Sequence, residues 1–175
     1  MNLKKDWKRV LLNLDANYAV TLAYNPHIKG SYEPTYRLKE NGNYQQITGR
    51  IGVGNRLTTM RNITKQIADK DTAFLAKQLD RKLLGSRYHK KPSIIWSKYA
   101  GFIEHANSNF HIHLMWKCHD PHGKAPRLIE ELWHSFDRNH LACVKPITDA
   151  IGWADYILKE QTLRDLKNLD FLVLN

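Results

Sequence analysis

The stretch FHIHL at residues 110–114 decides the fold, because two histidines flank one bulky apolar residue. Successive side chains of a β-strand point to opposite faces of a sheet. One face would carry His111, His113, Met115 and Lys117, and the other Phe110, Ile112, Leu114 and Trp116. The alternation predicts a strand with an apolar core face and a second face that carries the imidazoles.

A hairpin is expected immediately before this strand. Asn107 and Ser108 are turn-forming residues that lie between two apolar runs. A hairpin centred on them pairs Glu104 with His111, and directly opposed residues of adjacent strands share a face. A shift of one residue in this register would turn the carboxylate to the other face.

One carboxylate and two imidazoles would then converge, on Glu104, His111 and His113. Carboxylate and imidazole groups with an open position suit a hard or borderline divalent cation, and Mg²⁺ or Mn²⁺ is the expected metal. The competing interpretation is an ordinary hairpin with a polar outer face. We favour the metal site because the strand alternation, the apolar opposite face and the paired carboxylate agree.

The bulk composition indicates one globular domain over residues 1–175, with 42% hydrophobic and 25% charged residues. No apolar run approaches the roughly 18 residues of a membrane span, and the first residues lack the apolar segment of a signal peptide. Cys118 and Cys143 form no Cys-x-x-Cys motif. A reducing, cytoplasmic location without membrane partners is therefore expected.

The charge balance is strongly basic, with a formal net charge of +10. Such a charge attracts polyanions, of which nucleic acid is the commonest. The expected DNA-binding residues are clustered on and after a predicted helix: Lys77, Arg81, Lys82, Arg87, Lys90 and Lys91. Tyr88 and Trp96 interleave with these cations, where they could stack on unpaired bases or belong to the rim of the core.

The remaining pattern gives an α/β order of elements. Helices are expected at about 4–14, 63–84, from Pro126 onward and 149–162, and strands at about 20–24, 100–105, 110–117, 141–147 and 169–174. Trp7, Val10, Leu11 and Leu14 are expected to face inward on the first helix. Thr148 is the expected N-cap of the last helix. Residues 25–60 lack a clear period and are interpreted as loops with room for a hairpin.

The last predicted helix carries a second reactive group. Tyr156 and Lys159 would share one face at the i, i+3 spacing. A tyrosine oxygen can attack phosphorus, and an ammonium nearby stabilises the negative charge that develops. Tyr36 and Tyr88 also begin Tyr-x-x-Lys triplets, but only Tyr156 lies on a predicted helix after the histidine pair. The alternative is an amphipathic surface tyrosine.

Taken together, these motifs resemble those of the HUH endonucleases, in the branch of the replication initiators with one catalytic tyrosine. The first strand, Val20–Tyr24, looks like the family's apolar-Thr-Leu run. A polar ligand followed by His-apolar-His is matched by Glu104, His111 and His113, and the later Tyr-x-x-Lys by Tyr156 and Lys159. The order along the chain is also the family's, over roughly residues 18–165.

The resemblance implies a central antiparallel sheet with helices on its faces. It implies a metal-dependent enzyme that nicks and joins single-stranded or hairpin origin DNA, and so starts rolling-circle replication of a plasmid, phage or mobile element. Tyr156 would become joined to the 5′ phosphate, while Lys159 helps to hold the phosphate or the metal. The helix has no second nearby tyrosine and the chain no helicase segment, so a separate helicase would unwind the DNA.

Three alternatives remain open at this point. In a relaxase or transposase of related chemistry, Tyr18 or Tyr24 would be the nucleophile. A non-catalytic DNA-binding module would have the fold without the cleavage. A structural zinc protein would use residues around the strand end, namely Cys118, His119 and His122 together with His113.

Overall fold

The computed structural model describes residues 2–24, 36–38, 44–46, 65–106, 109–136, 140–159, 161 and 172–174. Its helices are α1 (Leu3–Asn13), α2 (Lys65–Leu84), α3 (Ala125–Phe136) and α4 (Ala150–Leu158), with short 3₁₀ turns at Tyr88–Lys90 and Ser93–Ile95. Its strands are β1 (Tyr18–Tyr24), β2 (Tyr36–Leu38), β3 (Tyr44–Gln46), β4 (Lys98–Ala106), β5 (Asn109–Lys117), β6 (Leu141–Pro146) and β7 (Leu172–Leu174).

The main sheet has the strand order β6-β1-β5-β4-β7, and every neighbouring pair is antiparallel. The elements β1, α2, β4, β5, α3 and β6 follow one another as β-α-β-β-α-β, with β5 inserted between β1 and β4. This is the ferredoxin-like, split βαβ arrangement. The expected α+β class with a central antiparallel sheet is therefore confirmed.

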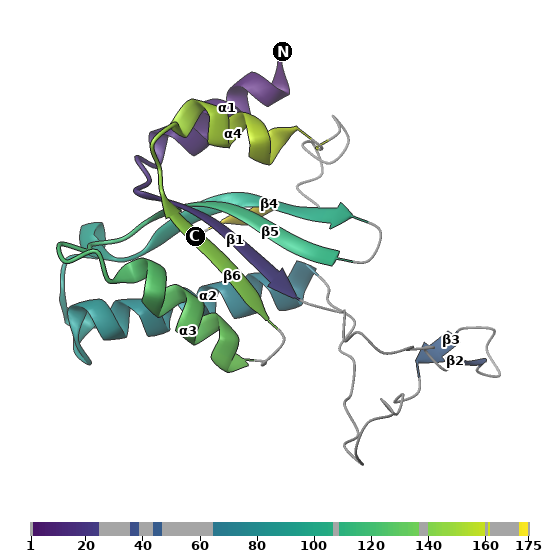
Figure 1. Ribbon diagram of the computed structural model, residues 1–175, viewed down its shortest axis with the longest axis horizontal. Helices are drawn as coiled ribbons and strands as arrows, with labels where there is room; N and C mark the ends of the chain where they lie inside the picture. Colours follow the sequence, from purple (N-terminus) through teal and green to yellow (C-terminus); the bar gives the residue numbers. More distant parts are fainter. Residues whose placement is uncertain are drawn as a thin grey trace.

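Helices cover both faces of this sheet (Figure 1). The larger apolar cluster joins α2 and α3 to one face, through side chains such as Leu75, Leu79 and Trp133. The smaller cluster joins α1 and α4 to the other face, through Leu11 and Ile157 among others. Strand β1 alternates strictly between buried and half-buried residues, as its period-two sequence predicts.

The faces of β5 follow the predicted alternation. Ile112, Leu114 and Trp116 belong to the larger cluster beneath α2 and α3. Met115 belongs to the smaller cluster, and His113 contacts α4 on that same side. The histidines therefore lie on the sheet face that α1 and α4 partly cover.

The expected helix and strand positions are largely confirmed, but the orientation of one apolar residue and the identity of one helix cap differ from the expectation. Val10, expected to face inward on α1, is 43% exposed. The N-cap of α4 is Asp149 rather than Thr148, because the Asp149 carboxylate accepts a hydrogen bond from the backbone N–H of Gly152 at 2.8 Å. A carboxylate satisfies an orphan N–H and also complements the positive end of the helix dipole.

Outside the main sheet, strands β2 and β3 pair as a short hairpin of their own. The rest of the loop-rich segment, and the first part of the strand expected at 169–174, lie outside the described residues. In the portion of the chain that is described, no helix is both long enough and apolar enough to cross a membrane.

Candidate metal and tyrosine site

The predicted hairpin register is confirmed. Strands β4 and β5 place Glu104 opposite His111, and Phe102 opposite His113. The register agrees with the period of two, because a shift of one residue would move the apolar side chains of the shifted strand out of the core. Glu104 and the two histidines consequently belong to the same face of the sheet.

The closest contact in this group is diagonal. Nε2 of His113 lies 2.6 Å from Oε2 of Glu104, and the two side chains are only 9% and 14% exposed. On the other side of the ring, Nδ1 of His113 lies 3.0 Å from the hydroxyl of Thr21, which strand β1 places directly opposite. The imidazole is thus held at both nitrogens, which fixes its orientation.

Burial sets the protonation state of this imidazole. The pKa of His113 is lowered, first by loss of solvation and then by the neighbouring His111 and Lys159, while the Glu104 carboxylate opposes the shift. The neutral ring is therefore favoured. In the contact with Glu104 the carboxylate accepts, so Nε2–H donates and Nδ1 accepts from the Thr21 hydroxyl.

This donor set fits a divalent cation. Two ligand atoms at about 2.1 Å from one ion and at right angles to each other lie about 3 Å apart, and Nε2 of His113 and the Glu104 carboxylate are 2.6 Å apart. A small increase in this separation would let an ion replace the proton between the two atoms. The Thr21 hydroxyl serves either tautomer, since it can donate to Nδ1 or accept from it.

His111 lies two residues before His113 in β5, on the same face of the sheet. Its ring is nearly parallel to that of His113, with centroids 6.1 Å apart. Within the residues that the structure describes, no group of three or more histidine, cysteine or carboxylate side chains is close enough to count as a metal cluster. Metal binding by Glu104, His111 and His113 together stays a prediction.

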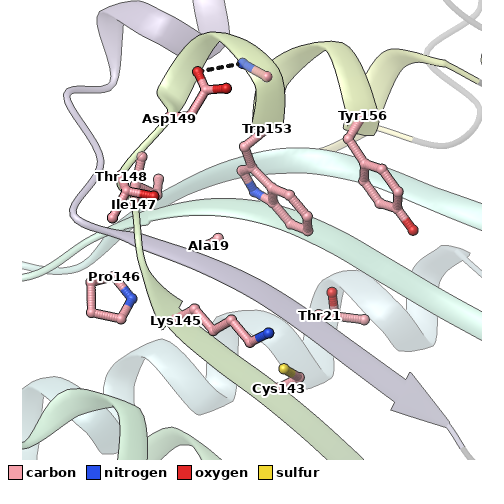
Figure 2. Close-up of a pocket in the computed structure, with 11 residues that line it drawn as sticks. Ala19, Thr21, Cys143, Lys145, Pro146, Ile147, Thr148, Asp149, Trp153 and Tyr156 are labelled. Atoms are coloured by element: carbon pink, nitrogen blue, oxygen red, sulfur yellow. Dashed lines mark hydrogen bonds between the residues drawn. The ribbon is translucent and has the colours of Figure 1, made fainter.

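Helix α4 brings the predicted nucleophile to this point. The ring of Tyr156 packs edge-on against the imidazole of His113, with centroids 5.1 Å apart. Tyr156 is also stacked on Trp153 at 5.0 Å and is 39% exposed. Both aromatic side chains extend from α4 over the sheet (Figure 2). The Tyr-x-x-Lys motif and the histidine motif are therefore neighbours in space.

Lys159 accompanies Tyr156. Its Nζ lies 4.0 Å from the centroid of the Tyr156 ring, a cation–π distance. Lys159 caps the C-terminus of α4, which ends at Leu158 rather than near residue 162. The predicted pair is thus together even though the helix stops between its two members.

A hydrogen bond to the sheet, an ion pair with α1 and an N-terminal cap hold α4 in place and so position Tyr156. The indole N–H of Trp153 donates to the backbone oxygen of Leu114, adjacent to His113, at 3.0 Å. Lys8 of α1 forms an ion pair with Asp155 at 2.6 Å. The absence of a side chain at Gly152 leaves room for the Asp149 cap, because a Cβ there would overlap with that carboxylate.

The predicted DNA-binding cations lie elsewhere. All six are exposed, on α2 or in the segment that follows it, and α2 packs on the opposite face of the sheet from the histidines. The segment after α2 is anchored to this helix at Ser97, whose N–H and hydroxyl donate to the Asp80 carboxylate. Ser97 precedes Glu104 along the same chain by about 23 Å at about 3.3 Å per extended residue. The structure does not bring this basic surface to His113.

The two aromatic residues of the basic surface have structural contacts. The indole N–H of Trp96 donates to the backbone oxygen of Tyr88 at 3.1 Å, and the two rings meet edge-on. Both residues are half-buried. The interpretation as rim or core aromatics therefore fits better than the one as open stacking platforms.

The alternative nucleophiles face the wrong side of the sheet. Tyr18 and Tyr24 are buried in the larger cluster, where their hydroxyls donate to Asp120 at 2.8 Å and to Asp71 at 3.2 Å. Burial together with the Asp120 contact also raises the pKa of Tyr18. Neither phenol can reach the histidines without leaving the core, which argues against the relaxase-like interpretation.

The zinc interpretation fails for a similar reason. Cys118 is buried in the larger cluster, and loss of solvation raises its pKa to about 12. His119 and His122 are exposed beyond the strand end, while His113 belongs to the opposite face. A thiol that stays protonated and points away from the imidazoles is a poor zinc ligand.

Sequence reasoning missed two members of the site. Thr21 was part of a predicted strand without a role, although its period-two position already placed it on the same face as Ala19 and Ala23. Trp153, which contacts both His113 and Tyr156, could have been suspected from its position three residues before the tyrosine. Comparisons with protein-family models, curated proteins and solved structures found no match for this chain.

Proposed function

We propose that this protein is a metal-dependent endonuclease and strand transferase of single-stranded DNA, which starts rolling-circle replication of a plasmid, phage or mobile element. The observation that carries the proposal is the contact between Tyr156 and His113 at 5.1 Å between ring centroids. Two short motifs that are far apart in the sequence converge where the exposed Tyr156 meets the buried His113. A candidate nucleophile beside a candidate metal ligand is the arrangement that phosphoryl transfer requires.

Each residue has a defined role in this proposal. Glu104, His111 and His113 would hold a divalent ion, Mg²⁺ or Mn²⁺, which supplies Lewis-acid chemistry at the scissile phosphate when bound. Oη of Tyr156 attacks the phosphorus in line. The phenol gives up its proton to solvent as the new P–O bond forms. The bond to the 3′ oxygen breaks, and that oxygen takes up a proton from solvent to leave a free 3′ hydroxyl. Lys159 stabilises the negative charge that develops on the transferring group.

The product retains the means to rejoin the strand. One phosphodiester is exchanged for a phosphotyrosine, so a 3′ hydroxyl can reverse the reaction and seal the DNA. The protein would act in the cytoplasm on single-stranded or hairpin origin DNA, and a separate helicase would supply the unwinding. These assignments rest on the motifs and on the contacts among Glu104, His113, Tyr156 and Lys159.

The direct test is a single-turnover nicking assay on a library of random-sequence oligonucleotides with Mg²⁺ or Mn²⁺. We expect a covalent protein–DNA adduct that survives denaturation, and a set of cleaved sequences that share a common core. Binding without any adduct, for every sequence and both metals, would instead identify a non-catalytic DNA-binding module.

Replacing Thr21 tests the orientation of the His113 ring. Thr21→Val keeps the shape of the side chain but removes the hydroxyl that lies 3.0 Å from Nδ1. Removing such an outer partner typically weakens metal affinity by about 10- to 100-fold. Calorimetric titration with Mn²⁺ measures the effect. Thr21→Ser, which keeps the hydroxyl, should bind almost as well as the parent protein, and equal affinities for Val and Ser would contradict the role.

Neutralising the basic surface should separate binding from cleavage. The variant Lys77→Gln, Arg81→Gln, Lys82→Gln removes charges that have no ion pair with any described acidic residue. The slope of log affinity for DNA against log salt should fall by up to about three, one unit for each phosphate that is no longer neutralised. The single-turnover rate at saturating DNA should not change, because this surface lies across the sheet from Tyr156.

The matched control removes the same charge from other exposed positions. Lys5→Gln, Arg9→Gln, Lys124→Gln uses side chains on α1 and before α3. Equal reductions of the slope in both triple variants would mean that only net charge matters. An unchanged slope in the first variant would move the DNA path to another surface.

A further inference from the structure

A cleft of about 520 Å³ opens beside the candidate site (Figure 2). Ala19 and Thr21 of β1 form its floor, Cys143 and Lys145 of β6 form one side, and Trp153 and Tyr156 of α4 form the roof. Its volume falls within the roughly 300–1,000 Å³ of pockets that hold small ligands. Among the residues that line it, Tyr156 is the one whose sequence motif predicts a catalytic role.

The cleft exists because the helices cover this face only in part. Helices α1 and α4 pack on β4 and β5, through side chains such as Phe102 and Met115. Beyond them, β1 places only the small Ala19 and the half-buried Thr21 on this face. These short side chains leave the space above the strand unfilled. Strand β6 pairs Lys145 with Ala19 and Cys143 with Thr21. Both side chains of β6 are exposed on the side of the cleft.

The cleft is continuous with the candidate site. Thr21 lines the cleft and contacts Nδ1 of His113 at 3.0 Å. Tyr156 also lines it and packs against the same imidazole. A DNA strand whose scissile phosphate lies at Tyr156 can therefore extend over Thr21 toward β6.

The lining suits a ligand with one planar group and one negative charge. The Trp153 indole supplies an aromatic surface, which the bond to Leu114 holds in place. Lys145 supplies an exposed ammonium that has no ion pair with the described acidic residues. The Asp149 carboxylate at the far end caps α4, where the positive end of the helix dipole offsets part of its charge, so Lys145 is the group in the lining best placed to bind an anion.

We propose that this cleft is the subsite for the nucleotide next to the scissile phosphate, with its base against Trp153 and its phosphate on Lys145. The inference rests on the proposed function and names the part of the substrate that the site reads. Stacking on an aromatic side chain and a charge-assisted phosphate contact recognise a nucleotide of any sequence and add preference through the fit of the base.

The protein carries its own probe for this proposal. Cys143 is exposed and lines the cleft, whereas Cys118 is buried and its pKa is raised to about 12. The thiolate is the reactive form, so a maleimide should label Cys143 and leave Cys118 unmodified in the folded protein. The rate of labelling then reports whether the cleft is filled, without any cleavage.

The first experiment measures labelling of the full chain in a chelator, with and without a cleavable oligonucleotide from the nicking assay. Where the nicking assay gives no cleaved sequence, a single-stranded oligonucleotide that the protein binds takes its place. We expect saturating oligonucleotide to slow labelling at least tenfold. A set of oligonucleotides with a single abasic site, moved one position at a time, should lose this protection at one position, adjacent to the scissile phosphate where the DNA is cleaved. Protection that is absent, or equal for every abasic position, would overturn the proposal.

The second experiment tests the phosphate contact. Lys145→Ala lies on an exposed edge strand and should fold, and it should weaken oligonucleotide binding about tenfold or more while lowering the salt slope by about one. The control is Lys98→Ala, another exposed lysine at the far end of β4. Equal effects of both variants would remove Lys145 from the subsite.

The two proposals fail in different ways. If the protein nicks DNA but oligonucleotides leave Cys143 labelling unchanged, the cleft is not the nucleotide subsite and the proposed function stands. If protection depends on one position yet no metal supports an adduct, the cleft binds a nucleotide and the proposed nicking activity is wrong.

Discussion

Tyr156→Phe is expected to abolish the covalent protein–DNA adduct. The substitution keeps the ring that packs on His113 and Trp153 and deletes only the oxygen that attacks phosphorus. Removal of a nucleophile lowers the rate of a covalent mechanism by at least about 10³-fold. A denaturing gel of the protein with a labelled oligonucleotide measures the adduct, while DNA binding and melting temperature should stay near those of the parent protein.

The chain offers a matched control for this experiment. Tyr88 begins a triplet of the same Tyr-x-x-Lys spacing but lies beside the basic surface, packed against Trp96. Tyr88→Phe should leave the adduct unchanged. An adduct that persists in Tyr156→Phe would transfer the role to another tyrosine, and its disappearance in Tyr18→Phe or Tyr24→Phe would revive the relaxase-like interpretation.

Replacing His113 should have an effect of similar size. His113→Ala removes the imidazole that contacts Glu104, Thr21 and Tyr156, and with it both the predicted metal ligand and the support for the tyrosine. Cleavage in Mg²⁺ or Mn²⁺ should become undetectable. Much of the DNA affinity should remain, because phosphate contacts supply most of it. Gel assays for cleavage and binding, run side by side, separate these two results.

Stability must be measured in the same variant. The substitution removes the group that lies 2.6 Å from the nearly buried Glu104 carboxylate, and loss of this hydrogen bond costs about 1–3 kcal/mol. His113→Gln returns a polar group, and His119→Ala controls for removal of an exposed histidine. Full cleavage by the parent protein in the presence of a chelator would contradict the metal role altogether.

Local patterns were enough to predict the hairpin. The turn residues centre the hairpin, and the period of two excludes a shift by one residue, which would expose core side chains, so Glu104 pairs with His111. They were not enough to predict which imidazole the carboxylate contacts. That choice depends on side-chain direction in a twisted sheet, and Glu104 reaches diagonally to His113.

The contacts between elements that are far apart in the sequence could not be predicted from local sequence patterns. The contact of Thr21 with His113 requires knowing that β1 pairs with β5, and the contact of Tyr156 requires knowing where α4 docks. The same limit applies to the basic residues: Lys77 and Arg81 could be clustered from their helical spacing, but not assigned to a face of the sheet. Thr148 and Asp149 are both good caps, and only the backbone geometry selects Asp149.

The unequal size of the two apolar clusters has a consequence for motion. Helices α1 and α4 are held by the smaller cluster and by the ion pair between Lys8 and Asp155, whereas α2 and α3 bury the larger one. Segments that bury less apolar surface open locally at a lower free-energy cost than the global fold. Helix α4 can therefore separate from the sheet while the strands keep their pairing, and in the proposed reaction a DNA end joined to Tyr156 would move with this helix.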